Sequence, residues 1–287
     1  MAFEKYRVRE GSKFRLKDHD PGDTGKFESK EQGKAHLAQG IARMRELQER
    51  LYAQDRWAVL LIFQAMDAAG KDSTIEHVMS GVNPQGTQVF SFKAPSNEEL
   101  DHDFMWRTSR SLPERGRIGI FNRSYYEEVL IVRVHPGILA GQKLPAELVG
   151  DDIWKERFED ICNFERYLAR NGTLIRKFFL HVSKDQQRKR FLARLDDPEK
   201  NWKFALGDVK EREHWDSYMQ AYEEMIGATS TDDAPWHVIP ADHKWFMRMA
   251  VADAIVEGLE SLKLEYPVVD EEKKKELQAA RELLVKE

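Results

Sequence analysis

The sequence predicts an α/β protein, a three-layer α/β/α sandwich built on a five-stranded parallel sheet. Five short apolar runs alternate along the chain with segments long enough to form crossover helices. Several runs are apolar at consecutive positions, which is typical of strands covered on both faces, as in parallel sheets. The expected strands are 57–65, 87–92, 117–123, 173–183 and 236–241.

Length and composition agree with this fold and exclude several classes of protein. The chain has 287 residues, 41% of them hydrophobic and 33% charged, so it can bury a sizeable core as one globular domain with appendages. No run approaches the roughly 18 apolar residues of a membrane span, and the charged first residues do not resemble a secretory signal. We therefore expect a cytoplasmic protein with no membrane partner. A formal net charge of −5 argues against a general nucleic-acid binder.

Cys162 is the only cysteine. A single cysteine excludes an intrachain disulfide and a cysteine-based metal site. Its surroundings, "FEDICNFERYL", are helix-like and apolar, so we expect a small buried side chain rather than a nucleophile.

The strands lie within a predicted core domain at 30–264, with an appendage at each end. Residues 1–29 are polar and rich in turn formers, which predicts an extended or irregular arm. Residues 30–54 place an apolar stripe on a charged helix that should pack on the core. The stripe consists of Leu37, Ile41, Met44, Leu47 and Leu51. Residues 265–287 predict a charged helix with a thin apolar stripe, either solvated or packed on a partner.

The stretch after the first expected strand, "QAMDAAGKDST", resembles a phosphate-binding loop. Such loops have the form G-x-x-x-x-G-K-[ST] and hold phosphate through backbone N–H groups, a helix N-terminus and the lysine. Gly70 and Lys71 keep this pattern, whereas Ala65 replaces the first glycine and Asp72 replaces the serine or threonine. The expected phosphate or nucleotide contacts come from Ala68, Ala69, Gly70, Asp72 and Ser73, with Lys71 as a catalytic cation. The alternative is a plain strand-to-helix turn in which Asp72 or Ser73 caps the helix.

Asp67 adds a carboxylate to this loop. A carboxylate beside phosphate is repulsive unless a divalent cation, or a proton in transit, lies between them. Asp67 is therefore predicted either to bind Mg²⁺ or to take a proton from an attacking phosphate. Both interpretations make it a catalytic residue.

A second group of polar residues follows the third expected strand, in "IGIFNRSYYEEVL". Ligands of parallel sheets bind outside the carboxyl ends of the strands, so Asn122 and Arg123 should face the same crevice as Lys71. Arg123 can hold phosphate oxygens and neutralise charge during phosphoryl transfer. Glu127 either points into that crevice or is a helix N-terminal acid stabilised by the dipole.

A basic run extends from Arg176 to Arg194 and contains a single acid, Asp185. The chain between the fourth and fifth strands is longer than a plain crossover needs. We therefore predict a lid at about 184–215 that closes over phosphates and excludes water. The alternative is a solvated, charged helix face.

Four stretches together resemble the polyphosphate kinase 2 family: "QAMDAAGKDSTI", "GIFNRSYYEEVLIVRVHP", "RFLARLDDPEKNWKF" and "APWHVIPADHKW". The resemblance extends from about Tyr6 to about Leu264. It implies a P-loop kinase fold similar to thymidylate kinase. It also implies Mg²⁺-dependent phosphoryl transfer, with Mn²⁺ as an alternative metal, between inorganic polyphosphate and nucleotides. The implied phosphate-loop residues are Asp67, Gly70 and Lys71, and Arg123 belongs to the second motif. Lid roles are implied for Arg188, Arg190 and Arg194, and the other candidate polyphosphate-binding or lid residues are Arg133, Lys200 and Lys203.

One departure from the family pattern concerns positions 122 and 127. Many members carry an acid where Asn122 stands and an asparagine where Glu127 stands. The combination here resembles the subgroup that phosphorylates both nucleoside monophosphates and diphosphates, which implies conversion of AMP through ADP to ATP. Because the carboxylate at 122 is missing, the metal is left to Asp67, with or without help from Glu127.

Two other functions remain open at this point. An ATP-dependent nucleoside monophosphate kinase would share the fold, and a P-loop binding module would use nucleotide to regulate partners. Against the second, the chain contains no Asn-Lys-x-Asp base-reading motif. The amphipathic helix at 30–54 and exposed aromatic residues favour a symmetric homo-oligomer.

Overall fold

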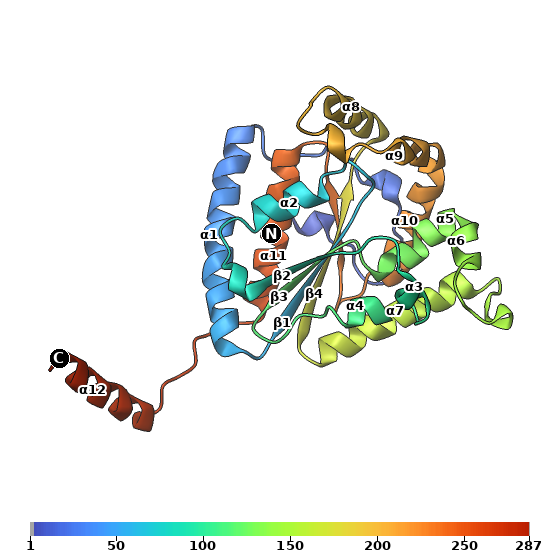
Figure 1. Ribbon diagram of the computed structural model, residues 1–287. Helices are drawn as coiled ribbons and strands as arrows, with labels where there is room; N and C mark the ends of the chain where they lie inside the picture. The colour runs from blue at the N-terminus through green and yellow to red at the C-terminus, as the bar shows by residue number, and fades with distance from the viewer. Residues whose placement is uncertain (1–2, 287) are drawn as a thin grey trace.

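The computed structural model describes residues 3–286, apart from the side chain of Lys203. In this part of the chain, five parallel strands form one sheet in the order β2-β3-β1-β4-β5, with helices on both faces (Figure 1). The strands are β1 (Ala58–Gln64), β2 (Thr87–Ser91), β3 (Ile118–Asn122), β4 (Thr173–His181) and β5 (Trp236–Pro240). The predicted three-layer sandwich is confirmed, and each strand lies within a residue or two of its expected bounds.

Two groups of helices form the outer layers (Figure 1). One face of the sheet is covered by α1 (Lys30–Gln54), α2 (Lys71–Val78) and α11 (Lys244–Ser261). The other face is covered by α7 (Ile153–Arg170) and α10 (Trp215–Thr229). No described helix is both long enough and apolar enough to cross a membrane.

The central strand, β1, is buried at every one of its seven positions. Phe63 of β1 stacks on Phe178 of β4, with ring centroids 5.0 Å apart. β2 is an edge strand that pairs only with β3 in this sheet, and Val89 on it is exposed. Burial on both faces is the reason that β1 has a continuous apolar sequence while β2 does not.

Helix α1 packs closely on α11. It begins after Ser29, whose side chain accepts a hydrogen bond from the backbone N–H of Gln32. The fully buried members of its predicted stripe are Met44, Leu47 and Leu51. A Cβ atom at Gly33 would lie 2.3 Å from the ring of Trp245, so only glycine allows the two helices this approach.

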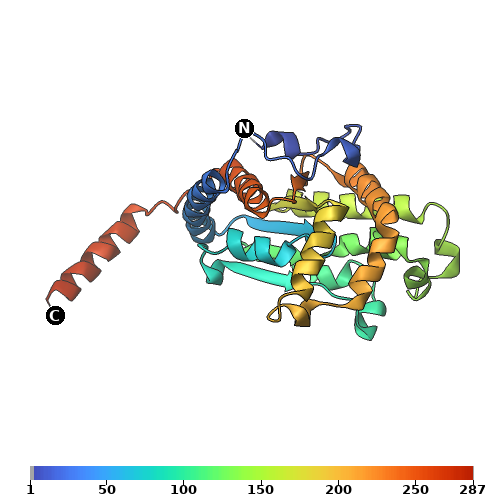
Figure 2. The same ribbon diagram turned by 90° about the horizontal axis from the view of Figure 1, so that it is seen from above.

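Residues 3–29 form an irregular arm that packs against the edge of β5 (Figure 2). It contains two short 3-10 helices, η1 (Glu4–Tyr6) and η2 (Leu16–Asp18). The backbone N–H of Val8 donates to the carbonyl of Trp236 at 2.8 Å, and Arg7 forms an antiparallel bridge with His237. The arm therefore covers an edge that would otherwise leave backbone groups unpaired.

The long segment between β4 and β5 begins with α8 (Lys184–Leu195) and leads into α10 through η6 (Asn201–Lys203), α9 (Leu206–Lys210) and η7 (Glu211–His214). Helix α12 (Glu271–Val285) stands apart from the rest of the molecule and is exposed along its length (Figures 1 and 2). The other short helices are η3 (Pro84–Gly86), α3 (Asn97–Leu100), α4 (Trp106–Ser109), η4 (Tyr125–Val129), α5 (Ile131–Val134), α6 (Pro136–Ala140) and η5 (Ala146–Leu148).

A buried ion pair joins β4 to α7. The Nζ of Lys177 lies 2.6 Å from Glu165 Oε2, and both side chains are fully buried. Glu165 Oε1 also accepts hydrogen bonds of 2.8 Å from the hydroxyl groups of Tyr125 and Tyr126 in η4. The Nζ of Lys177 also donates a hydrogen bond to the carbonyl of Thr229 at 2.7 Å. These bonds fix η4 to the core, and they place both tyrosine rings in the core rather than on the surface.

Replacing Lys177 alone should destabilise the protein strongly, because the Glu165 carboxylate would stay buried without its cation. We expect Lys177→Met to lower the free energy of unfolding by about 3–5 kcal/mol. Lys177→Met with Glu165→Gln removes both charges but keeps an acceptor for the tyrosines, so it should recover most of that loss. Denaturant unfolding at one protein concentration measures both values. A double variant as unstable as the sum of Lys177→Met and Glu165→Gln, each measured alone, would contradict this account.

Candidate active site

The loop after β1 meets the turn after β3 at the carboxyl edge of the sheet. Arg123, the residue after β3, donates from its backbone N–H to the carbonyl of Phe63 at 3.0 Å. Its guanidinium donates from Nη2 to Asp67 Oδ1 at 2.8 Å and from Nη1 to Glu127 Oε2 at 3.2 Å. Asp67, Arg123 and Glu127 therefore lie together in the structure.

Two carboxylates pair with the guanidinium of Arg123 and stabilise its charged form. The carboxylate of Glu127 and, to a smaller extent, that of Asp67 raise the pKa of Arg123 against the opposing effect of burial. Arg123 also adopts a left-handed backbone with φ of 67°. Non-glycine residues adopt this conformation rarely and at a cost in free energy, and such residues are concentrated at functional sites.

The loop turns sharply before α2. Ala68 and Gly70 have positive φ values of 59° and 108°. Gly70 is the N-cap of α2, and its carbonyl accepts from the backbone N–H and hydroxyl groups of Thr74 at 3.0 and 2.8 Å. Because the N-cap is a glycine, neither Asp72 nor Ser73 caps the helix. The first backbone N–H groups of α2 thus lack a side-chain partner and stay available to an anion.

Lys71 points back along the loop. Its Nζ donates to the carbonyl of Ala65 at 2.7 Å, and only 9% of the residue is exposed. Burial, and then the nearby charge of Arg123, lower the pKa of Lys71 to about 8. A bound phosphate would offset both effects, because a negative neighbour favours the charged form of lysine.

Asn122 lies beside the start of α2. Its Nδ2 donates to Asp72 Oδ1 at 2.6 Å, which ties the end of β3 to the first turn of the helix. Ser73 donates from Oγ to the carbonyl of Gly70 at 3.2 Å. Asn122 therefore orients a carboxylate of the phosphate loop.

Arg190 of α8 reaches underneath the loop. Its Nη1 donates to the carbonyls of Ala69 and Ala68 at 2.6 and 3.2 Å, and its Nη2 donates to the carbonyl of Asp242 at 3.1 Å. Gln187, on the same helix, donates to the carbonyl of Asp67 at 2.9 Å. Helix α8 therefore holds the loop in place through hydrogen bonds to the backbone carbonyls of the loop.

The other predicted lid cations lie farther from the loop or pair elsewhere. Arg194 lies 3.8 Å from Asp208, and Arg188 pairs with Asp185 at 2.7 Å on an exposed face. Lys200 forms an ion pair with Asp197. The side chain of Lys203 lies outside the described residues.

Arg133 lies on a different element from the predicted lid. It belongs to α5, pairs with Glu224 of α10, and its guanidinium lies 5.8 Å from the centre of the Trp154 ring. These contacts place Arg133 between α5, α7 and α10.

The sequence did not single out several residues at this site. Burial, and then the charge of Asp67, raise the pKa of Asp208. Tyr222 is buried nearby, and burial and the Glu127 carboxylate raise its pKa. Gln187 and Asp208 lie within the predicted lid but are not cations, and Tyr222 lies beyond it, so the basic pattern did not single them out.

Cys162 is partly buried rather than fully buried. Its Sγ lies 3.6 Å from the carbonyl of Ala228, and burial raises the pKa of its thiol. A thiol of raised pKa carries little thiolate, so the expected structural role agrees with its surroundings.

Comparison with known proteins places these features in a family. The family model described as polyphosphate kinase 2 matches residues 27–267. An ADP-polyphosphate phosphotransferase of Rhodopseudomonas palustris is 55% identical over 284 residues, which cover 99% of this chain and 98% of that protein. An AMP/ADP-polyphosphate phosphotransferase of Meiothermus ruber is 47% identical over 268 residues, covering 92% of this chain and 95% of that protein.

A crystal structure of polyphosphate kinase 2 from Arthrobacter aurescens superposes with a TM-score of 0.90 at 43% identity, covering 99% of this chain and 96% of that one. The match extends over the sheet, both helical layers and the segment between β4 and β5. Together with the family model, it confirms the resemblance predicted from the four motifs. The chain belongs to the polyphosphate kinase 2 family.

Proposed function

We propose that this kinase transfers a phosphoryl group between inorganic polyphosphate and nucleoside mono- or diphosphates, with AMP and ADP as acceptors that become ADP and ATP. The family and the relatives named polyphosphate phosphotransferases support polyphosphate-dependent transfer. The observation that carries the proposal is the joining of the phosphate loop to Arg123 through Asp67 at the carboxyl edge of the sheet.

The site can stabilise transfer between two polyanions without a covalent enzyme intermediate. The N-terminus of α2 and Lys71 bind phosphate oxygens, and Arg123 neutralises charge that spreads over the transferred group. Asp67 and Glu127 hold the Arg123 guanidinium in place. Such transfer needs alignment and cationic stabilisation, and little other chemistry from the protein.

We propose Mg²⁺ as the metal, with Mn²⁺ as a substitute. The described residues contain no group of three or more His, Cys, Asp or Glu side chains arranged to hold a metal ion. Mg²⁺ at phosphate sites is commonly bound by one or two carboxylates together with substrate phosphates. Asp67 is partly exposed, and its negative charge raises the pKa of Asp208. A cation bound with the phosphates would reduce the repulsion between these two carboxylates. When bound, the metal would neutralise charge on the phosphates.

The choice of acceptors rests on positions 122 and 127. Asn122 donates to Asp72 and Glu127 accepts from Arg123, and both differ from the acid and asparagine that many family members carry at these two positions. The M. ruber relative, at 47% identity, is named for both AMP and ADP. These points support successive phosphorylation of AMP and ADP.

We further propose that residues 184–215 act as the lid over the phosphates, with Arg188, Arg194, Lys200 and Lys203 toward the polyphosphate chain. Residues 3–29 are then an arm on the catalytic domain, and α12 is a separate C-terminal helix. A cytoplasmic homo-oligomer without nucleic-acid partners is the setting that we propose for this enzyme.

The reaction itself is tested by supplying the purified protein with ADP, Mg²⁺ and long-chain polyphosphate. We expect ATP to form, and AMP to give ADP first and ATP later. ATP with AMP, in the absence of polyphosphate, is the matched assay for a nucleoside monophosphate kinase. Absence of ATP from polyphosphate at any Mg²⁺ or Mn²⁺ concentration would reject the proposal.

Removing single charges from the site should abolish transfer while preserving the fold. We expect Lys71→Ala, Asp67→Asn and Arg123→Ala each to lower kcat by about 100-fold or more, because each alters the charges that act on the transferred phosphoryl group. Asp67→Asn should also raise the Mg²⁺ concentration that gives half the maximal rate. Lys275→Ala on the exposed helix α12 is the control and should keep the parent rate. Near-parent turnover in the Lys71 variant would remove the central assignment.

The rate should depend on the protonation of Lys71. Its pKa of about 8 lies below the usual value, so the free enzyme loses this cation as the pH rises through about 8. We expect kcat/KM to fall with a slope near −1 above that pH. The fall in kcat should occur at higher pH, because bound phosphates stabilise the charged lysine. Steady-state kinetics between pH 6.5 and 10 measure both profiles, and a flat kcat/KM profile would contradict this role.

A further inference from the structure

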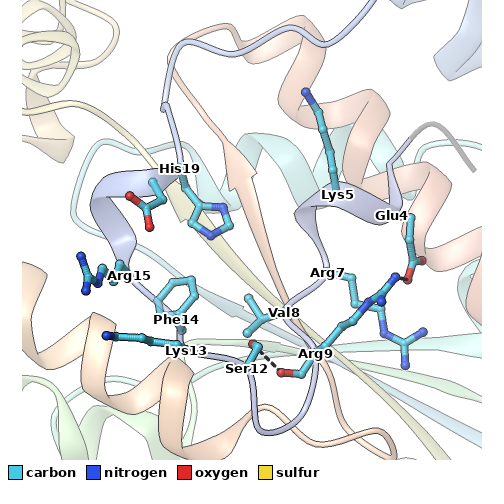
Figure 3. Close-up of a pocket in the computed structure, with 11 residues that line it drawn as sticks. Glu4, Lys5, Arg7, Val8, Arg9, Ser12, Lys13, Phe14, Arg15 and His19 are labelled. Atoms are coloured by element: carbon cyan, nitrogen blue, oxygen red, sulfur yellow. Dashed lines mark hydrogen bonds and ion pairs between the residues drawn. The ribbon is translucent and has the colours of Figure 1, made fainter.

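The N-terminal arm contains a cavity of about 470 Å³ that lies outside the proposed active site (Figure 3). It lies where the arm covers the edge of β5, whereas the phosphate loop follows the central strand β1. Its apolar floor includes Val8 and Phe14. We call this cavity the arm groove. Its charged lining residues are Glu4, Lys5, Arg7, Arg9, Lys13, Arg15 and Asp18.

The arm groove is strongly basic in a protein whose formal net charge is −5. Five cations and two carboxylates line it. Lys5 pairs with Asp23, and Arg9 lies 3.9 Å from Glu4. Within residues 3–286, no ion pair joins Arg7, Lys13 or Arg15 to a carboxylate. These three charges are therefore available to an anion.

Arg7 also lies close enough to Arg176 of β4 for their charges to affect each other. Burial, and then the charge of Arg7, lower the pKa of Arg176 to about 10, although Glu257 opposes this shift. Burial, and then both arginines, lower the pKa of His237 to about 3. Like charges held together in this way raise the free energy of the ligand-free protein, and an anion beside Arg7 would lower it.

The backbone that carries the cations is held in place. Val8 is bonded to Trp236, and its carbonyl accepts from the hydroxyl of Ser230 at 2.7 Å. The backbone N–H of Leu16 donates to Glu223 at 2.7 Å. A site on an anchored backbone loses little conformational entropy when it binds a ligand.

The positions of the cations favour an extended anion over a compact one. In Figure 3, Lys13 and Arg15 lie on one side of the groove and Arg7 and Arg9 on the other, with Val8 and Phe14 between them. They do not converge on one point, as they would around a single phosphate. A flexible chain of phosphates could contact both sides in succession.

We propose that the arm groove binds inorganic polyphosphate along the chain, away from the end that reacts. This proposal rests on polyphosphate being the substrate. A chain held in the groove keeps its reactive end at a raised local concentration near the phosphate loop. Only chains long enough to occupy the groove as well as the active site gain from it.

The test uses the variant Arg9→Gln/Lys13→Gln/Arg15→Gln, which removes three exposed cations. Arg7 is left in place because, unlike the other three, it is partly buried. The matched control, Lys273→Gln/Lys274→Gln/Lys275→Gln, removes three exposed cations from α12. Steady-state kinetics are measured with long-chain polyphosphate and with the shortest chain that the parent enzyme uses, and binding of long-chain polyphosphate is titrated directly at several salt concentrations.

We expect the arm-groove variant to raise KM and Kd for the long chain about tenfold, with kcat and the short-chain parameters unchanged. The slope of log Kd against log salt should fall by about 2, because three cations no longer release counterions. The control should match the parent in every measurement.

Two outcomes would overturn the proposal: an unchanged Kd for the long chain, or an equal loss for the short chain. Stronger binding of a single-stranded oligonucleotide than of polyphosphate at the groove would also overturn it. If the parent transfers no phosphate from polyphosphate, the proposed function fails. The titration still tests the groove in that case. A higher Kd for long-chain polyphosphate in the arm-groove variant than in the parent supports binding at the groove, and an equal Kd rejects it.

Discussion

The guanidinium of Arg123 links Asp67 in the loop after β1 to Glu127 in the turn after β3, and the proposed phosphate site depends on that contact. Asp67 and Glu127 place carboxylates at the proposed site of a polyanion, and they would repel it without a cation between them. The same guanidinium pairs with both carboxylates and remains partly exposed to a ligand. A parallel sheet makes the contact available, because the chain leaves β1 and β3 at the same edge.

A buried network behind this contact determines where it forms. The turn that follows Arg123 is fixed by Tyr125 and Tyr126, whose hydroxyl groups bond to Glu165, and Glu165 in turn pairs with Lys177. Charged groups at such depth contribute little net stability compared with apolar packing. They do specify one arrangement of η4 against α7 and β4. A site that must align two anions needs that kind of specificity more than it needs additional stability.

The sequence predicted the parts of this protein that local patterns determine. Burial on both faces makes β1 a continuous apolar run, and the loop after it places Gly70 and Lys71 at the start of α2, as the phosphate-loop pattern predicts. The role of Arg190 could not be predicted, because its partners are backbone carbonyls at Ala69 and Asp242, far from it in sequence. A basic helix pattern cannot show which cations turn inward. The convergence of Asp208 with Asp67 depends on the path of the segment between β4 and β5, which composition does not encode.

Asp242 links three regions that the sequence separates widely. Its carboxylate accepts from the backbone N–H and hydroxyl of Ser183 at 2.8 and 2.7 Å, which fixes the start of α8, and its own N–H donates to the carbonyl of Pro21 in the arm at 3.0 Å. Its carbonyl accepts from Arg190, which holds the phosphate loop. A group attached near the N-terminus is therefore connected to the reaction centre through the arm, whereas one attached near the C-terminus is not. A tag, fusion partner or solid support at the N-terminus pulls on a segment connected to the reaction centre, whereas one placed beyond α12 acts on a helix that stands clear of it.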